Sequence, residues 1–510
     1  MADFEQYFEQ YSQTETSGAL LKRRSLQSGL ITVAAQPFKL VIGIVATAVL
    51  ARLVTPADFG LVAMVMPLLS FGDSLSNLGL ESATVQQQSL NHQQASETFW
   101  FSLKVNAAIM AGMILLGPVT AKFYHQPSLT LLTWAMSVGF FSLCLSFQHK
   151  ALLKRQMKFE LLTAIELGAI AIATVAAVGA AWLGLGYWAL MLQVVVMQVV
   201  QGIAYWLTCR WRPTRIQGND SAKADHSTKA MLSYGANLTG FRFLTRIGMQ
   251  LDRILVGYIS GATALGFYDV AYRWAAFPFT QVYFSLFDVA VASFSRAYGD
   301  KEAYRQYCRW GIMPLFAICL PSLAFLYVAA EEVILVLLGD QWLAAVPIFR
   351  LLAIAMFVGS AHKVTKWLYM SSGQTQRQLH WGLIHTPLLI VAVCIGATQG
   401  AYGIAMGYTL GTCALTYPSV AYCLQKSPLT TADFWGTMWR PAVASIASAL
   451  CLFWSQPGVS NIDNSFFRLS AEAIGFSSLY VLFWFLLPGG KRSVIEIVGH
   501  IKCLRSNADG

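Results

Sequence analysis

Residues 28–65, SGLITVAAQPFKLVIGIVATAVLARLVTPADFGLVAMV, have a counterpart 206 positions later in residues 234–271, YGANLTGFRFLTRIGMQLDRILVGYISGATALGFYDVA. The two segments align without a gap, and Gly60 falls opposite Gly266. Each contains a long apolar span, a short turn and the start of a second span. The repeat therefore predicts two halves with one fold and one direction through the membrane. Parallel halves of this kind are typical of transporters, which hold the substrate between them.

The composition of the whole chain is that of a polytopic membrane protein. Of its 510 residues, 56% are hydrophobic and 12% are charged, with a mean hydropathy of +0.53, whereas soluble domains carry about 25% charged residues. Apolar runs of about 20 residues, the length that crosses a bilayer, follow one another along the chain. They predict fourteen membrane-spanning helices, near residues 30–50, 59–80, 99–121, 129–148, 161–183, 186–208, 231–258, 264–290, 308–329, 342–369, 381–398, 402–424, 437–457 and 470–489.

These spans predict an all-α fold with two pseudo-symmetric lobes of six helices around a central cavity, plus two further helices. The expected divisions are a leader (1–29), an N-lobe (30–208), an interlobe loop (209–230), a C-lobe (231–424), the last two spans (425–489) and a tail (490–510).

The distribution of Lys and Arg predicts the orientation in the membrane, because short cytoplasmic loops carry an excess of both. Alternate connections contain the basic clusters Lys150–Lys154–Arg155–Lys158 and Arg210–Arg212–Arg215, and the leader contains Lys22, Arg23 and Arg24. Leader, interlobe loop and tail are therefore expected in the cytoplasm. The net charge of +10 follows from these loops and does not indicate a nucleic-acid partner. No cleavable signal peptide is expected, since the first apolar run is too long.

Several cations lie inside expected spans, where each costs on the order of 3 kcal/mol on insertion scales. Arg242 and Arg246 are four residues apart and share a helix face. Lys39 lies on the corresponding helix of the first half, one position from the register of Arg246. With Arg273, these residues predict a cationic cavity for an anionic ligand, because guanidinium groups match phosphate oxygens. Alternatively, Arg242 reaches the lipid headgroups at the membrane surface.

Acidic residues inside spans have two expected roles. Asp252 and Arg253 are expected to form a structural ion pair, either locally or between the lobes. Asp269, four residues before Arg273, is expected to form another, since the acid-first order favours a helical pair. Asp73 and Asp288 are candidates for coupling transport to an ion gradient, which needs a carboxylate whose charge changes.

Motifs for enzymatic chemistry are missing from the sequence. It has no Gly-Lys-Ser/Thr after a glycine-rich turn, which argues against ATP hydrolysis, and none of its nine cysteines forms a Cys-x-x-Cys pair. The histidines lie mostly in loops or at span ends and pair with no expected nucleophile. The chain is therefore expected to be no enzyme and to need no metal or cofactor.

The stretch ARLVTPADFGLVAMVMPLLSFGDSLSNLGLESATVQ, residues 51–86, resembles the bacterial polysaccharide flippases of the Wzx type. These belong to the multidrug/oligosaccharidyl-lipid/polysaccharide exporter superfamily. The most specific part is the series Arg52, Leu53, Pro56, Asp58, Phe59 and Gly60, and the second half contains the similar segment LDRILVGYISGATALGFYDVAYR. The nearest subgroup in pattern is that of the colanic-acid and exopolysaccharide exporters.

The resemblance implies a substrate, a membrane and partners. The substrate would be an oligosaccharide linked to undecaprenyl pyrophosphate, moved across the bacterial inner membrane by alternating access coupled to an ion gradient. Membrane lipid, a polymerase and a co-polymerase of the polysaccharide pathway are the implied partners. Two alternatives remain open at this point: a multidrug or cation antiporter of the same superfamily, and a membrane scaffold of a polysaccharide assembly complex that transports nothing.

Overall fold

The computed structural model describes the backbone of residues 18–76, 81, 84–85, 90–214, 221–459 and 464–490, and their side chains except in 18–34, 221–249 and 456–459. All regular secondary structure in these residues is helical. The predicted all-α fold is therefore confirmed.

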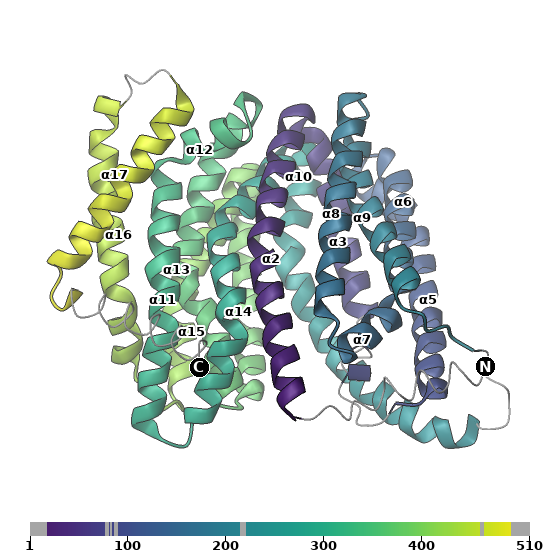
Figure 1. Ribbon diagram of the computed structural model, residues 1–510. Coiled ribbons are helices and arrows are strands. Elements are labelled where there is room, and N and C mark those ends of the chain that lie inside the picture. The colour runs from purple at the N-terminus through teal and green to yellow at the C-terminus, as the bar shows by residue number, and fades with distance from the viewer. Residues whose placement is uncertain are drawn as a thin grey trace. The chain divides into compact units, whose positions relative to one another are not determined.

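The helices follow one another with short connections (Figure 1). Their bounds are α2 Gly18–Leu53, α3 Pro56–Ser76, α5 His92–Tyr124, α6 Ser128–Cys144, α7 Phe147–Arg155, α8 Phe159–Trp182, α9 Tyr187–Thr208, α10 Ser221–Ala297, α11 Lys301–Val328, α12 Ala330–Leu337, η1 Asp340–Ala345, α13 Val346–Ser371, α14 Thr375–Gly396, η2 Ala397–Gln399, α15 Gly400–Leu424, α16 Thr431–Val459 and α17 Ser465–Leu486.

The structure differs from the expected spans in three places. The run expected at 129–148 is divided into α6 and the separate short helix α7. The two spans expected at 231–258 and 264–290 form the single element α10, which starts at Ser221 and is interrupted at Gly261, where φ is 79°. The short elements α12 and η1 were not expected, because hydropathy does not separate a short helix from the end of a span.

The count of fourteen membrane-spanning helices is not confirmed. Within the described residues, eleven helical segments are long and apolar enough to cross a membrane. Two of them, Gln250–Ala297 and Thr375–Leu424, have 48 and 50 residues and contain a break, at Gly261 and at η2 respectively. The helix α16 is not among the eleven. The chain is a multi-pass membrane protein, whatever the final number of crossings.

The chain divides into two compact units, one ending at Gly266 and the other beginning at Phe267. A core of the first unit surrounds Phe99, Leu153 and Tyr205, and the main core of the second surrounds Phe316 and Trp367. Large apolar side chains such as Leu115, Val175 and Leu207 are exposed, as expected of surfaces that face lipid. The division falls inside α10, so the lobe boundaries expected from the sequence stay a prediction.

A glycine contact in the first unit follows the offset of the sequence repeat. A Cβ on Gly60 of α3 would lie 1.7 Å from the carbonyl oxygen of Ala262, just after the break in α10. A Cβ on Gly266 would lie 1.9 Å from the carbonyl oxygen of Pro56. Since Pro56 is 206 positions before Ala262, and Gly60 is 206 before Gly266, the two contacts are reciprocal, as across a two-fold axis. Small residues let helix backbones approach this closely in membranes.

We expect Gly60→Ala to destabilise the protein by about 1–3 kcal/mol, because the added methyl group meets backbone atoms that must move. Gly179→Ala in α8 is the matched control, since nothing lies within 4 Å of its added Cβ and alanine favours helix by about 1 kcal/mol. Thermal unfolding of the detergent-solubilised variants measures both effects. Equal melting temperatures for the two variants would show that the close contact is not formed.

Candidate functional site

Lys39 of α2 forms an ion pair with Glu166 of α8 in the first unit. Both side chains are partly buried, with 18% and 30% of their surfaces exposed. Lys150 of α7 lies 3.9 Å from the other carboxylate oxygen of Glu166. Glu166 therefore has two cationic partners, and Lys39 has a carboxylate that reduces the cost of placing an ammonium group in an apolar helix.

A second pair lies one helical turn further along α7. Lys154 is 2.5 Å from Glu81, and the neighbouring Arg155 donates a hydrogen bond to the backbone oxygen of Thr84 at 3.1 Å. Lys150 and Lys154 are four residues apart, so they lie on the same face of α7. With Lys39, they provide three positive charges against the two carboxylates Glu81 and Glu166.

The pairing changes the interpretation of Lys39. The sequence predicts a cation that awaits an anionic ligand, whereas the structure gives it a protein carboxylate. Glu166 was not predicted as its partner because 127 positions separate the two residues and the repeat relates Lys39 to α10, not to α8. Contact between Lys39 and a substrate stays a prediction.

Of the three arginines expected in the cavity, the structure describes the side chain of Arg273 alone. Arg242 and Arg246 belong to α10, but their side chains lie outside the described residues, so their predicted role stays a prediction. Arg273 on the same element is 2.6 Å from Asp269, which is buried with 5% of its surface exposed. This is the i,i+4 pair expected from the sequence.

Asp252 and Arg253 lie where α10 packs against α3. Asp252 is buried and accepts a hydrogen bond from the backbone amide of Arg253 at 2.8 Å. The Arg253 guanidinium donates to the Gln250 side-chain oxygen at 2.8 Å, and Gln250 in turn donates to the Ser70 hydroxyl at 3.0 Å. The chain of contacts joins two helices of the first unit, which suits a structural role. The coupling candidates Asp73 and Asp288 are both exposed, and their coupling role stays a prediction.

The second unit contains a cluster of two lysines and two histidines that the sequence did not lead us to expect: His362, Lys363 and Lys366 of α13 with His385 of α14. The Lys363 ammonium lies 2.9 Å from the Met356 sulfur and 4.8 Å from the centre of the Phe279 ring. The imidazole rings of His362 and His385 stack in parallel, 4.3 Å apart. The signal was present in the sequence, because two lysines lie within the expected span 342–369.

The described residues provide no carboxylate counter-ion for the Lys363 ammonium group. Among the described side chains, no carboxylate lies within 4.0 Å of its ammonium group, and its two close partners are a thioether and an aromatic ring. A cation–π contact is worth about 0.5–2 kcal/mol, less than the several kcal/mol that a buried ammonium costs. The Nδ1 atom of the neighbouring His362 is also buried without a hydrogen-bond partner. The cluster can therefore accept an anion.

Asp433, just before the apolar part of α16, shows the contrasting case of a charge fully used by the fold. It accepts hydrogen bonds from Thr430 and Arg309, and Arg305 lies 3.7 Å away. Partial burial raises the pKa of Asp433, but the hydrogen bonds from Thr430 and Arg309 outweigh it and hold the pKa below its usual range. The cluster joins α11 to α16, and its second arginine, Arg305, also donates a hydrogen bond to the backbone oxygen of Pro428 at 2.8 Å.

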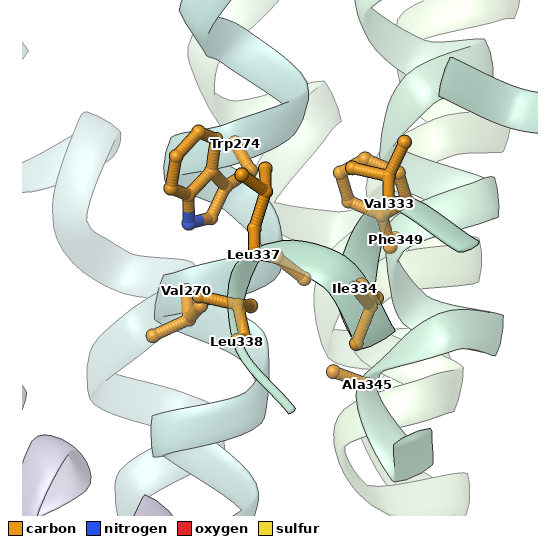
Figure 2. Close-up of a pocket in the computed structure, with 9 residues that line it drawn as sticks. Val270, Trp274, Val333, Ile334, Leu337, Leu338, Ala345 and Phe349 are labelled. Carbon is orange, nitrogen blue, oxygen red and sulfur yellow. The ribbon is translucent and has the colours of Figure 1, made fainter. Parts of the chain in front are cut away.

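An apolar cavity in the second unit is a poor site for a charged group. Figure 2 shows its lining, which comes from α10, α12 and α13 and includes Trp274, Ile334 and Phe349. It contains none of the charged candidates. Among the described residues, no group of three or more His, Cys, Asp or Glu side chains is arranged to hold a metal ion.

Comparison with known sequences identifies relatives over most of the chain. The profile of the family described as "Polysaccharide biosynthesis protein" matches residues 49–347, more than half of the chain. The lipopolysaccharide biosynthesis protein WzxC of Escherichia coli K12 is 22% identical over 72% of this chain and 74% of its own length. The teichuronic acid biosynthesis protein TuaB of Bacillus subtilis 168 is 24% identical over 82% of this chain and 85% of its own length.

Solved structures share the fold. The lipid II flippase MurJ in an inward closed conformation superposes with a TM-score of 0.67 and 11% identity, over 89% of this chain and 97% of its own. An inward-facing multidrug resistance MATE transporter of the MOP superfamily gives a TM-score of 0.59 and 14% identity, over 76% and 93% respectively. The chain thus shares its fold with these two proteins, as the sequence resemblance implied. By its sequence match, the chain belongs to the polysaccharide biosynthesis protein family.

Proposed function

We propose that the protein moves an oligosaccharide linked to undecaprenyl pyrophosphate across the bacterial inner membrane. Support comes from family membership, from the fold shared with the lipid II flippase MurJ, and from cations in apolar helices. The proposal includes alternating access between two lobes, coupling to an ion gradient, and leader and tail in the cytoplasm. A polymerase and a co-polymerase would use the product on the far side.

The observation that carries the proposal is the environment of Lys363. Its ammonium group rests on Met356 and Phe279 and has no described carboxylate within 4.0 Å. A pyrophosphate brings at least two negative charges, and charge-assisted hydrogen bonds to it are about twice as strong as neutral ones. Binding would exchange two weak contacts for a full ion pair. His362, whose Nδ1 has no partner, can add a hydrogen bond to the same group.

The first unit offers a second way to bind phosphate, through exchange of partners. Glu166 has two lysines, Lys39 and Lys150. If a phosphate drew Lys39 away, Lys150 would still neutralise the carboxylate, so no unpaired buried charge would remain. Lys39 can therefore act as a ligand although it is paired with Glu166.

The two alternatives have less support. A cation antiporter needs carboxylates at its substrate site, whereas a cationic drug beside Lys363 would be repelled. A scaffold that transports nothing would have no use for a partly buried lysine without a carboxylate, which lowers the stability of the fold.

We expect Lys363→Gln to weaken binding of undecaprenyl pyrophosphate about tenfold, the loss of one charged hydrogen bond, and to reduce polysaccharide export. Lys363→Arg should keep part of the affinity, because the positive charge remains. Lys301→Gln, at the exposed start of α11, is the control. Tryptophan fluorescence titration of the purified protein measures the affinity, and surface polysaccharide of a complemented deletion strain measures export. Unchanged affinity in Lys363→Gln would contradict the proposed site.

If Lys39 and Lys150 exchange at Glu166, the effect of Lys150→Gln on pyrophosphate affinity should depend on whether Glu166 is present. Lys150→Gln should weaken pyrophosphate binding several-fold, because Glu166 then retains Lys39 more tightly. Adding Glu166→Gln should restore the affinity, since Lys39 is released. Lys104→Gln, an exposed lysine on α5, controls for the loss of positive charge. The same titration provides the measurement, and equal effects of Lys150→Gln with and without Glu166→Gln would exclude the exchange.

A further inference from the structure

Two acidic residues and one arginine form a buried cluster between α12 and α17 of the second unit. Arg468 of α17 lies 2.6 Å from Glu332 of α12, and its Nε lies 3.5 Å from Glu472, one helical turn further along α17. The Glu472 side chain is fully buried, and 6% of the Glu332 side chain is exposed. In Figure 1, α17 lies beside α16 at the end of the colour scale.

The distances assign the arginine to one of the two carboxylates. At 2.6 Å the contact with Glu332 is a strong charged hydrogen bond. The 3.5 Å separation from Glu472 is longer than a hydrogen bond. Neither oxygen of Glu472 receives a hydrogen bond in the described structure, and the second oxygen of Glu332 receives none either. Glu472 is therefore a fully buried carboxyl group that no donor satisfies.

The charges of the cluster do not balance when both acids are ionised. One guanidinium against two carboxylates leaves one negative charge in a buried site, which costs several kcal/mol. A single proton removes this excess, and it supplies an O–H group that can donate to a free oxygen of Glu332.

The surroundings offer no other described cation. Glu332 and Arg468 are the charged groups that act on Glu472, and Glu331 on α12 points away as an exposed residue. One and two turns further along α17, Phe476 and Tyr480 pack against α11 and α16, in a cluster that includes Ala324, Val328 and Leu452. The Tyr480 hydroxyl donates to the backbone oxygen of Ala317. The helices that enclose Glu472 therefore contribute apolar side chains.

We propose that Glu472 and Glu332 form a proton-binding site in which one proton resides on Glu472 at neutral pH and is shared with Glu332. Release of the proton leaves two carboxylates that repel each other across the contact between α12 and α17. The site differs from the coupling candidates Asp73 and Asp288, and it does not depend on the substrate proposed above.

The test compares Glu472→Gln with Glu332→Gln in the full-length protein, by thermal unfolding between pH 4 and pH 9 in choline chloride. Glutamine resembles a protonated glutamic acid. We expect Glu472→Gln to melt with the wild type at pH 4, where the carboxyl group is protonated in both the folded and the unfolded wild type. At pH 9 it should melt about 3 °C or more above the wild type, because only the wild type gains free energy on unfolding by releasing a proton from this residue. Glu332→Gln should melt below the wild type at every pH, because Arg468 loses its carboxylate. Glu160→Gln, an exposed acid on α8, is the control.

Two results would overturn the proposal. If Glu472→Gln melts below the wild type over the whole pH range, Glu472 is ionised and Arg468 needs its charge. If sodium chloride in place of choline chloride stabilises the wild type but not Glu472→Gln, the ligand is a sodium ion and not a proton. Neither result would affect the binding of pyrophosphate at Lys363, so a failure here is distinct from a failure of the proposed function.

Discussion

The free-energy cost of burying a charged side chain in an apolar helix determines how the charged residues of this protein are paired. Each ion in a membrane-spanning segment loses hydration, and the fold must replace it with a partner. Lys39 receives Glu166, Arg273 receives Asp269 and Arg468 receives Glu332. These pairs make Lys363 conspicuous, because its ammonium has a sulfur atom and an aromatic ring as its close partners. A group left short of its counter-charge by the protein is suited to a charged ligand.

The same constraint separates structural charges from functional ones. A pair with one donor and one acceptor, such as Asp269 and Arg273, is complete and holds a helix together. A group with a surplus partner can exchange it, as Glu166 can between Lys39 and Lys150. A cluster with too few positive charges, such as Glu332, Arg468 and Glu472, can hold a proton. The balance of positive and negative side chains in a cluster therefore indicates which ligand the cluster can bind. An uncompensated lysine suits an anion, and an uncompensated carboxylate suits a proton.

The sequence predicts the helices well because a bilayer allows little else. Hydropathy locates the spans, and the 206-residue repeat relates Gly60 to Gly266, whose close contacts with backbone oxygens the structure then shows. Hydropathy could not show that α7 is a separate helix or that α10 runs on from one expected span to the next with only a break at Gly261. Nor could it pair Lys39 with Glu166, since tertiary packing brings them together across 127 positions. The environment of Lys363 could not be predicted either, because the sequence does not show which side chains pack against its ammonium group.

The most direct measurement of the central claim is a cryo-EM map of the protein with undecaprenyl pyrophosphate bound. The account predicts a phosphate oxygen about 3 Å from the Lys363 ammonium, with the ammonium no longer in contact with Met356. A pyrophosphate bound elsewhere, with Lys363 still resting on Met356 and Phe279, would contradict it.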